Sequence, residues 1–221
     1  GPGVMRFSAC KGAYWVDGHL INLSSTDLSV VSNDDISLEF VREEQGADVV
    51  YAVHAVPRRP IEWQYLVIEA EMDYRDNKGI FCNGFQSWTE TKVFDTGAVM
   101  KPARRVLKGV AFKFGDYGFY DYARRPGRLH SWTYTYIKRE KLMVDLLASL
   151  DERNGYTVFE HDTVNGRLII RKDLEGKRIG EPVTLLRFMH LREQEKQAFA
   201  AYAEAKQSPQ IPVRPELGWT S

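Results

Sequence analysis

The sequence has no apolar run of the roughly 18 to 20 residues that a bilayer-crossing helix requires, and its start lacks the charged-then-apolar pattern of a secretory signal. It contains only two cysteines, Cys10 and Cys82, with neither metal-finger nor C-x-x-C spacing. We therefore expect free thiols, no membrane partner and a cytoplasmic location. Residues 1–3 resemble the remnant of a cleaved tag, so a native signal could have been trimmed with it.

The chain also carries no net charge at neutral pH. The chain has 30 Lys and Arg against 30 Asp and Glu, and the basic residues are scattered rather than clustered. No net field would attract a polyanion, so we expect no nucleic-acid partner. With 221 residues, 43% of them hydrophobic, the chain can bury a substantial core and should be folded.

The familiar motifs of catalysis and cofactor binding do not occur. There is no G-x-S-x-G elbow, P-loop, G-x-G-x-x-G or H-E-x-x-H, so we predict no cofactor and no metal. Glu69, Glu71 and Asp73 alternate along one face of a predicted strand, where paired carboxylates could perform acid–base work. Like charges on a solvated sheet face are the favoured interpretation. The five histidines show no ligand spacing either and are interpreted as ordinary strand or surface residues: His19, His54, His130, His161 and His190.

The sequence pattern predicts mainly short β-strands. Apolar and polar residues alternate over 36–40 and 49–53, and residues 63–72 form a denser apolar run, as half-buried and buried strands do. Asn165-Gly166 lies between two such runs and is a strong hairpin signal, because both residues tolerate positive φ. The pattern predicts an all-β fold, an antiparallel sandwich over residues 4–191, with a barrel as second choice.

The pattern changes near Leu191. Residues 192–207 are rich in Ala, Glu, Gln and Lys, with apolar residues at helical spacing, which predicts a linker helix. Residues 208–221 carry three prolines that no helix could continue through, so we expect an extended connector. The sequence ends on "LGWTS", which is typical of the start of another element, and we expect it to be a truncated first strand of a further domain.

Residues 112–137 are crowded with aromatic side chains. Aromatic rings stack on the apolar faces of sugars, so a carbohydrate-binding surface is one interpretation. Aromatics also favour strands, and Tyr134 and Tyr136 alternate as a sheet requires. Packing within and between strands is the favoured interpretation. The four basic residues in 100–109 are interpreted as a solvated loop.

Two segments resemble a known family. "NGFQSWTETKVFD", residues 83–95, is similar to the N-terminal-domain motif of glycoside hydrolase family 36, the α-galactosidases and their relatives. "PELGWTS", residues 215–221, resembles the entry into the (β/α)8 catalytic barrel of that family. The predicted helix and connector between them match the passage from sandwich to barrel. The resemblance implies the β-supersandwich domain of a retaining glycosidase, with the catalytic barrel as its partner.

In that family the tryptophan of the Q-S-W run, here Trp88, lies on a loop that helps form the sugar pocket of the barrel. The resemblance implies that Trp88 contacts the sugar, and that the other loop residues support it: Asn83, Gly84, Phe85, Gln86 and Ser87. An indole can cover a galactose face while its N–H serves a hydroxyl. The two catalytic aspartates would lie beyond Ser221, so this part of the chain has no catalytic residue and should be inactive alone.

Three alternatives stay open. A relative acting on α-N-acetylgalactosamine or α-galactosamine would share the same domain, since barrel loops set that specificity. A free-standing carbohydrate-binding module would bind galactosides without a barrel. A structural role, as in a homo-oligomer contact, would leave sugar affinity independent of Trp88.

Overall fold

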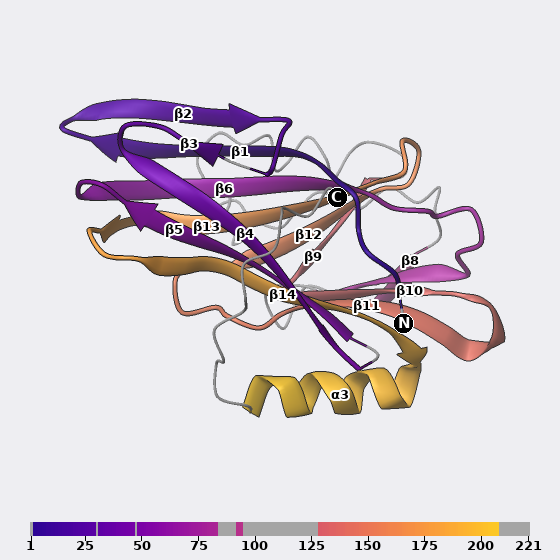
Figure 1. Ribbon diagram of the computed structural model, residues 1–221. Coiled ribbons are helices and arrows are strands. Elements are labelled where there is room, and N and C mark those ends of the chain that lie inside the picture. The colour runs from indigo at the N-terminus through magenta and orange to yellow at the C-terminus, as the bar shows by residue number, and fades with distance from the viewer. Residues whose placement is uncertain (1, 30, 47, 84–91, 95–127, 208–221) are drawn as a thin grey trace.

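The computed structural model describes residues 2–29, 31–46, 48–83, 92–94 and 128–207. Two antiparallel sheets pack face to face, and one helix follows them (Figure 1). The predicted antiparallel sandwich is therefore confirmed. No helix among the described residues is long and apolar enough to cross a membrane.

The first sheet has six strands in the order β2-β1-β6-β13-β12-β9. Its members are β1 (Phe7–Val16), β2 (His19–Ser25), β6 (Ile61–Glu71), β9 (Arg128–Trp132), β12 (Thr157–Asp162) and β13 (Arg167–Ile179). The β6 and β13 pair continues over most of their length and forms the centre of this sheet.

The second sheet has eight strands in the order β3-β4-β5-β14-β11-β10-β7-β8. Its members are β3 (Val31–Ser32), β4 (Ile36–Gln45), β5 (Asp48–Pro57), β7 (Gly79–Cys82), β8 (Lys92–Phe94), β10 (Tyr134–Lys138), β11 (Met143–Ser149) and β14 (Val183–Gln194). A short 3-10 turn, η1 (Glu140–Leu142), joins β10 to β11.

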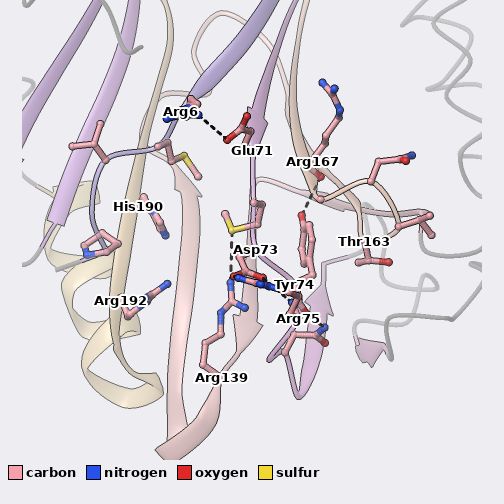
Figure 2. A pocket seen from close by; sticks show the side chains of 18 residues that line it. Arg6, Glu71, Asp73, Tyr74, Arg75, Arg139, Thr163, Arg167, His190 and Arg192 are labelled. Atoms are coloured by element: carbon pink, nitrogen blue, oxygen red, sulfur yellow. Dashed lines mark hydrogen bonds and ion pairs between the residues drawn. The ribbon is translucent and has the colours of Figure 1, made fainter. Parts of the chain in front are cut away.

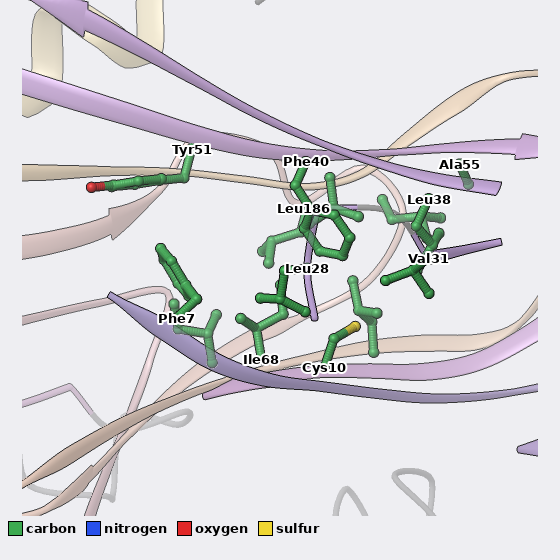
Figure 3. Packing of buried hydrophobic residues seen from close by; sticks show 14 of the residues in the cluster. Phe7, Cys10, Leu28, Val31, Leu38, Phe40, Tyr51, Ala55, Ile68 and Leu186 are labelled. Carbon is green, nitrogen blue, oxygen red and sulfur yellow. The ribbon is translucent and has the colours of Figure 1, made fainter. Parts of the chain in front are cut away.

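The main core lies between the two sheets (Figure 3). Alternate residues of each strand point inward, so aromatic rings from distant strands meet there. Phe7 of β1 lies edge-on to Tyr51 of β5 with ring centroids 5.2 Å apart, and Tyr51 stacks on Phe188 of β14 at the same spacing. Burying side chains of this size supplies the main stabilisation of the sandwich.

A second core lies between the outer face of the eight-stranded sheet and helix α3 (Glu195–Gln207). Ala198 and Tyr202 are buried there, and the Tyr202 hydroxyl donates to the Ser149 carbonyl over 3.1 Å. The helix begins at Glu195 rather than at residue 192, because residues 192–194 stay hydrogen-bonded in register with β11.

The hairpin predicted at Asn165-Gly166 joins β12 to β13. The connection comprises residues 163–166, so Asn165-Gly166 forms its second half, and Gly166 has a φ of +66°. Asp162 supports the turn, since its carboxylate accepts a hydrogen bond from the Asn165 backbone N–H over 3.1 Å. Turn chemistry that is visible in the sequence thus sets the register between β12 and β13.

Candidate functional site

The predicted sugar-contacting loop starts at the end of a hairpin strand. β7 pairs with β8, and Cys82 lies opposite Lys92, so residues 83–91 connect two neighbouring antiparallel strands. Trp88 and the supporting residues Gly84, Phe85, Gln86 and Ser87 lie outside the described residues. Asn83, the first residue of the motif, is described.

Asn83 is tied to strand β9 by three hydrogen bonds. Its backbone N–H donates to the Ser131 hydroxyl over 2.6 Å, and its carbonyl accepts from the Trp132 N–H over 3.0 Å. Its side-chain amide donates to the Trp132 carbonyl over 2.8 Å. β9 is an edge strand of the six-stranded sheet, and β7 lies next to the edge strand of the other, so Asn83 connects the two sheets at the start of the loop.

A buried chain of side-chain hydrogen bonds lies behind this anchor. Thr135 Oγ1 donates to the Phe81 carbonyl over 2.8 Å and lies 2.8 Å from His161 Nε2, while His161 Nδ1 lies 2.7 Å from the Tyr74 hydroxyl. Burial, with a smaller contribution from the positive charge of Arg139, lowers the pKa of His161 to about 3. The ring is therefore neutral near pH 7.

The neutral ring has one N–H, and its partners determine which nitrogen carries it. Because the Thr135 hydroxyl donates its proton to a carbonyl, Nε2 of His161 must donate to Thr135. Nδ1 then accepts from the Tyr74 hydroxyl. With this tautomer, the hydrogen bonds of Thr135 to Phe81, of His161 to Thr135 and of Tyr74 to His161 all form. The Tyr74 hydroxyl also lies 3.2 Å from the Arg167 carbonyl, which is the longest contact in the network. The network joins the two sheets without any charged group.

Aromatic packing covers the opposite face of β7. The ring of Phe81 stacks on Tyr136 with centroids 4.7 Å apart and on Tyr134 at 5.5 Å, and Phe199 of α3 meets Tyr136 edge-on. The described end of the aromatic segment thus packs within the sheet and against the helix, as the favoured interpretation predicted. The remainder of that segment, residues 112–127, lies outside the described residues.

A hollow of about 980 Å³ opens where the N-terminal segment crosses the end of β6 (Figure 2). Two of the three carboxylates predicted to share one strand face line this hollow, Glu71 at the end of β6 and Asp73 just beyond it, whereas Glu69 pairs with Arg167 at 3.4 Å. Glu71 lies 3.9 Å from Arg6, and Asp73 forms an ion pair of 2.7 Å with Arg75. All four side chains are well exposed, so these are solvated ion pairs rather than an acid–base pair.

Below this hollow, Asp145 of β11 is completely buried among two arginines and a histidine. One carboxylate oxygen accepts from His190 and Arg192, and the other accepts from Arg139 and Arg192, with distances between 2.7 and 3.0 Å. Burial by itself would raise the pKa of Asp145. The hydrogen bonds from His190, Arg192 and Arg139 outweigh it and hold that pKa well below its usual range.

These groups have structural rather than reactive chemistry. Asp145 is ionised but fully engaged and shielded from any substrate. The thiols of Cys10 and Cys82 are buried, and burial raises the pKa of each to about 12, so neither is a ready nucleophile. No group of three or more potential ligands within the described ranges could hold a metal ion.

Sequence reasoning selected Asn83 but missed its supporting residues. Ser131, Thr135 and His161 are buried polar residues of β9, β10 and β12, and a buried polar side chain normally has a dedicated hydrogen-bond partner. The local sequence does not identify the partner of each residue, because their contacts span up to 87 positions.

No protein-family model matches the chain, and no curated protein matches its sequence. Among solved structures, it is similar to an α-galactosidase from Thermus thermophilus in complex with stachyose, with 16% identity and a TM-score of 0.42. The match covers 75% of this chain and 32% of that one, so the chain spans about a third of the neighbour's length. The same enzyme in complex with p-nitrophenyl α-D-galactopyranoside matches with 16% identity and a TM-score of 0.41, over 75% and 31% of the two chains.

Proposed function

We propose that this chain is the non-catalytic N-terminal sandwich domain of a retaining glycoside hydrolase of the α-galactosidase type. In this proposal the loop of residues 83–91 completes the sugar pocket of a catalytic barrel, and Trp88 contacts the sugar. The substrate class is a terminal α-linked galactoside. The catalytic aspartates belong to the barrel.

The observation that carries the proposal is the position of the N-G-F-Q-S-W motif in the fold. The motif starts at Asn83, where three hydrogen bonds hold the chain to β9, and it lies between the paired strands β7 and β8. A binding side chain must be held near its productive position by rigid supporting groups. A firmly anchored loop start is what a tryptophan that reaches toward a neighbouring domain would need.

The buried network behind the anchor adds a second support. Thr135 and His161 hold the Phe81 carbonyl one residue before Cys82, and Tyr134, Tyr136 and Phe199 pack on the Phe81 ring. Both faces of β7 are therefore restrained by side chains. A rigid β7 would hold the start of the loop in place and so lower the entropy cost of sugar binding.

The test is the substitution Trp88→Ala in a longer protein that carries both this domain and a barrel. We expect KM for p-nitrophenyl α-galactoside to rise, with a loss in kcat/KM of about 1 to 3 kcal/mol, or roughly 5- to 150-fold. The p-nitrophenyl α-N-acetylgalactosaminide counterpart, assayed in parallel, would identify the sugar.

Trp15→Ala is the matched control, because Trp15 is 39% exposed on the outer face of the six-stranded sheet. It should leave the kinetics unchanged. Unaltered KM and kcat in Trp88→Ala would refute the role proposed for the loop. Tight galactoside binding by the 221-residue chain alone would instead favour the free-standing binding module.

A further inference from the structure

Among the described residues, strand β2 forms an unprotected edge of the six-stranded sheet. It has seven residues, "HLINLSS", and it pairs with β1 in continuous register from Cys10↔Ser25 to Val16↔His19, without a bulge. No other described strand pairs with it, and it lies at the outer margin of the fold (Figure 1). It contains no proline, lysine, arginine or carboxylate. Natural sheets usually protect an edge of this length with one of these devices.

The other three sheet edges are protected. β3 and β8 have only two and three residues. β4 continues past β3, but it carries three charged residues near its end, at 42–44. β9 is short, and residues 129–132 are buried. The contrast shows that β2 is an exception within this molecule, which indicates an edge that is used for pairing.

The side chains of β2 are divided between two faces. Ile21 and Leu23 point inward and pack against the main core, yet both remain only half-buried. Leu20, Asn22 and Ser24 point outward and are exposed. The core is therefore incomplete along this edge, because two apolar side chains at its margin are partly in contact with water.

We infer that β2 pairs with β2 of a second copy of this chain, antiparallel about a two-fold axis at Asn22. Residues directly opposite in an antiparallel pair lie on the same face. With Asn22 opposite Asn22 of the second copy, Ile21 lies opposite Leu23, and Leu23 lies opposite Ile21. Each half-buried apolar residue thus covers its counterpart, and the two six-stranded sheets become continuous.

Registers displaced by two residues fit less well. Placing Ile21 opposite itself sets Leu23 against His19, and placing Leu23 opposite itself sets Ile21 against Ser25. Only the register centred on Asn22 matches both apolar residues with apolar partners, which is why a second copy is the partner we assign. One strand pair buries less area than a permanent interface, so the dimer should be in concentration-dependent equilibrium with the monomer.

The test is sedimentation over a concentration series, combined with cysteine crosslinking. In the inferred register, Cα atoms of opposed residues are about 4.5 to 5.5 Å apart, within the range that a disulfide spans. Asn22→Cys should therefore give a covalent dimer on mild oxidation. The native Cys10 and Cys82 are buried and do not compete.

Ser24→Cys is the matched control on the same exposed face. Residue 24 lies opposite residue 20, so its two copies are about 13 Å apart along the strands and should not crosslink. Asn22→Lys should weaken dimerisation several-fold by placing two like charges opposite each other. A chain that sediments as a monomer up to its solubility limit, or equal crosslinking by the two cysteine variants, would overturn the inference. The test is independent of glycosidase activity.

Discussion

Asp145 and Glu160 are both buried carboxylates on sheet strands, and each is bound by two arginines. Their pKa values nevertheless shift in opposite directions. Asp145 accepts four hydrogen bonds, and its pKa lies well below its usual range although burial opposes this. Glu160 accepts one hydrogen bond each from Arg128 and Arg171, and burial raises its pKa despite both cations. At Asp145 four hydrogen bonds outweigh burial, whereas at Glu160 burial outweighs the two arginines.

The neighbouring histidines show the same difference. His190 donates to Asp145 and belongs to its cluster. His130 lies opposite Glu160 in the β9–β12 pair, and burial, with a smaller contribution from Arg171, lowers the pKa of His130 to about 4. Asp145 thus receives hydrogen bonds from two arginines and an imidazole, whereas Glu160 lies beside a neutral imidazole.

Asp145→Asn should produce the largest effect. An amide in place of the carboxylate presents an N–H toward one of its arginines and leaves Arg139, which is 8% exposed, with only the exposed carboxylate of Asp76 as an ionic partner. We expect a loss of about 3 to 5 kcal/mol in the free energy of unfolding, measured by urea denaturation. Asp73→Asn, which removes an exposed carboxylate paired with Arg75, is the control and should be close to neutral. A small loss at Asp145 would show that the fourfold pairing contributes little.

Glu160→Gln should cost less, about 1 to 2 kcal/mol, since the raised pKa indicates that a neutral group is tolerated there. Arg128 also keeps a second carboxylate, Asp162, at 3.3 Å. The same urea titration measures this variant. A loss equal to that of Asp145→Asn would remove the distinction between the two sites.

The pH dependence should show the smallest effect but the clearest contrast in sign. A raised folded pKa means that native Glu160 binds protons more tightly than the unfolded chain. Between its ordinary value of 4.5 and the raised value, the wild-type protein should therefore gain stability relative to Glu160→Gln as the pH falls. The difference in stability between the wild-type protein and Asp145→Asn should stay constant from pH 7 to 5, because Asp145 is ionised there in both the folded and the unfolded chain. Parallel curves for the two variants would contradict this account.

Much of the fold was predictable because it depends on local patterns. The alternation over 36–40 and 49–53 became strands β4 and β5, and Asn165-Gly166 became part of the central hairpin. The helix start was less accurate, because tertiary pairing extended β14 into residues of good helix propensity. Local preference decided the turns, and neighbouring strands decided the boundaries.

The candidate site divides in the same way. The motif that starts at Asn83 is a run of adjacent residues, so it could be recognised in the sequence. The groups that anchor it come from residues 131 and 132, and the carboxylate clusters draw on segments far apart in the chain. The count of 30 basic and 30 acidic residues does not determine which of them form ion pairs.

The sequence by itself therefore determined the fold class, the turns and the position of the motif, since these follow from the periodicity and backbone preferences of neighbouring residues. The tertiary structure alone decided which polar groups are buried together, which buried carboxylate stays ionised despite its burial, and which edge strand has no second partner among the described residues. Those outcomes depend on distances between residues that only folding brings within a few ångströms of each other.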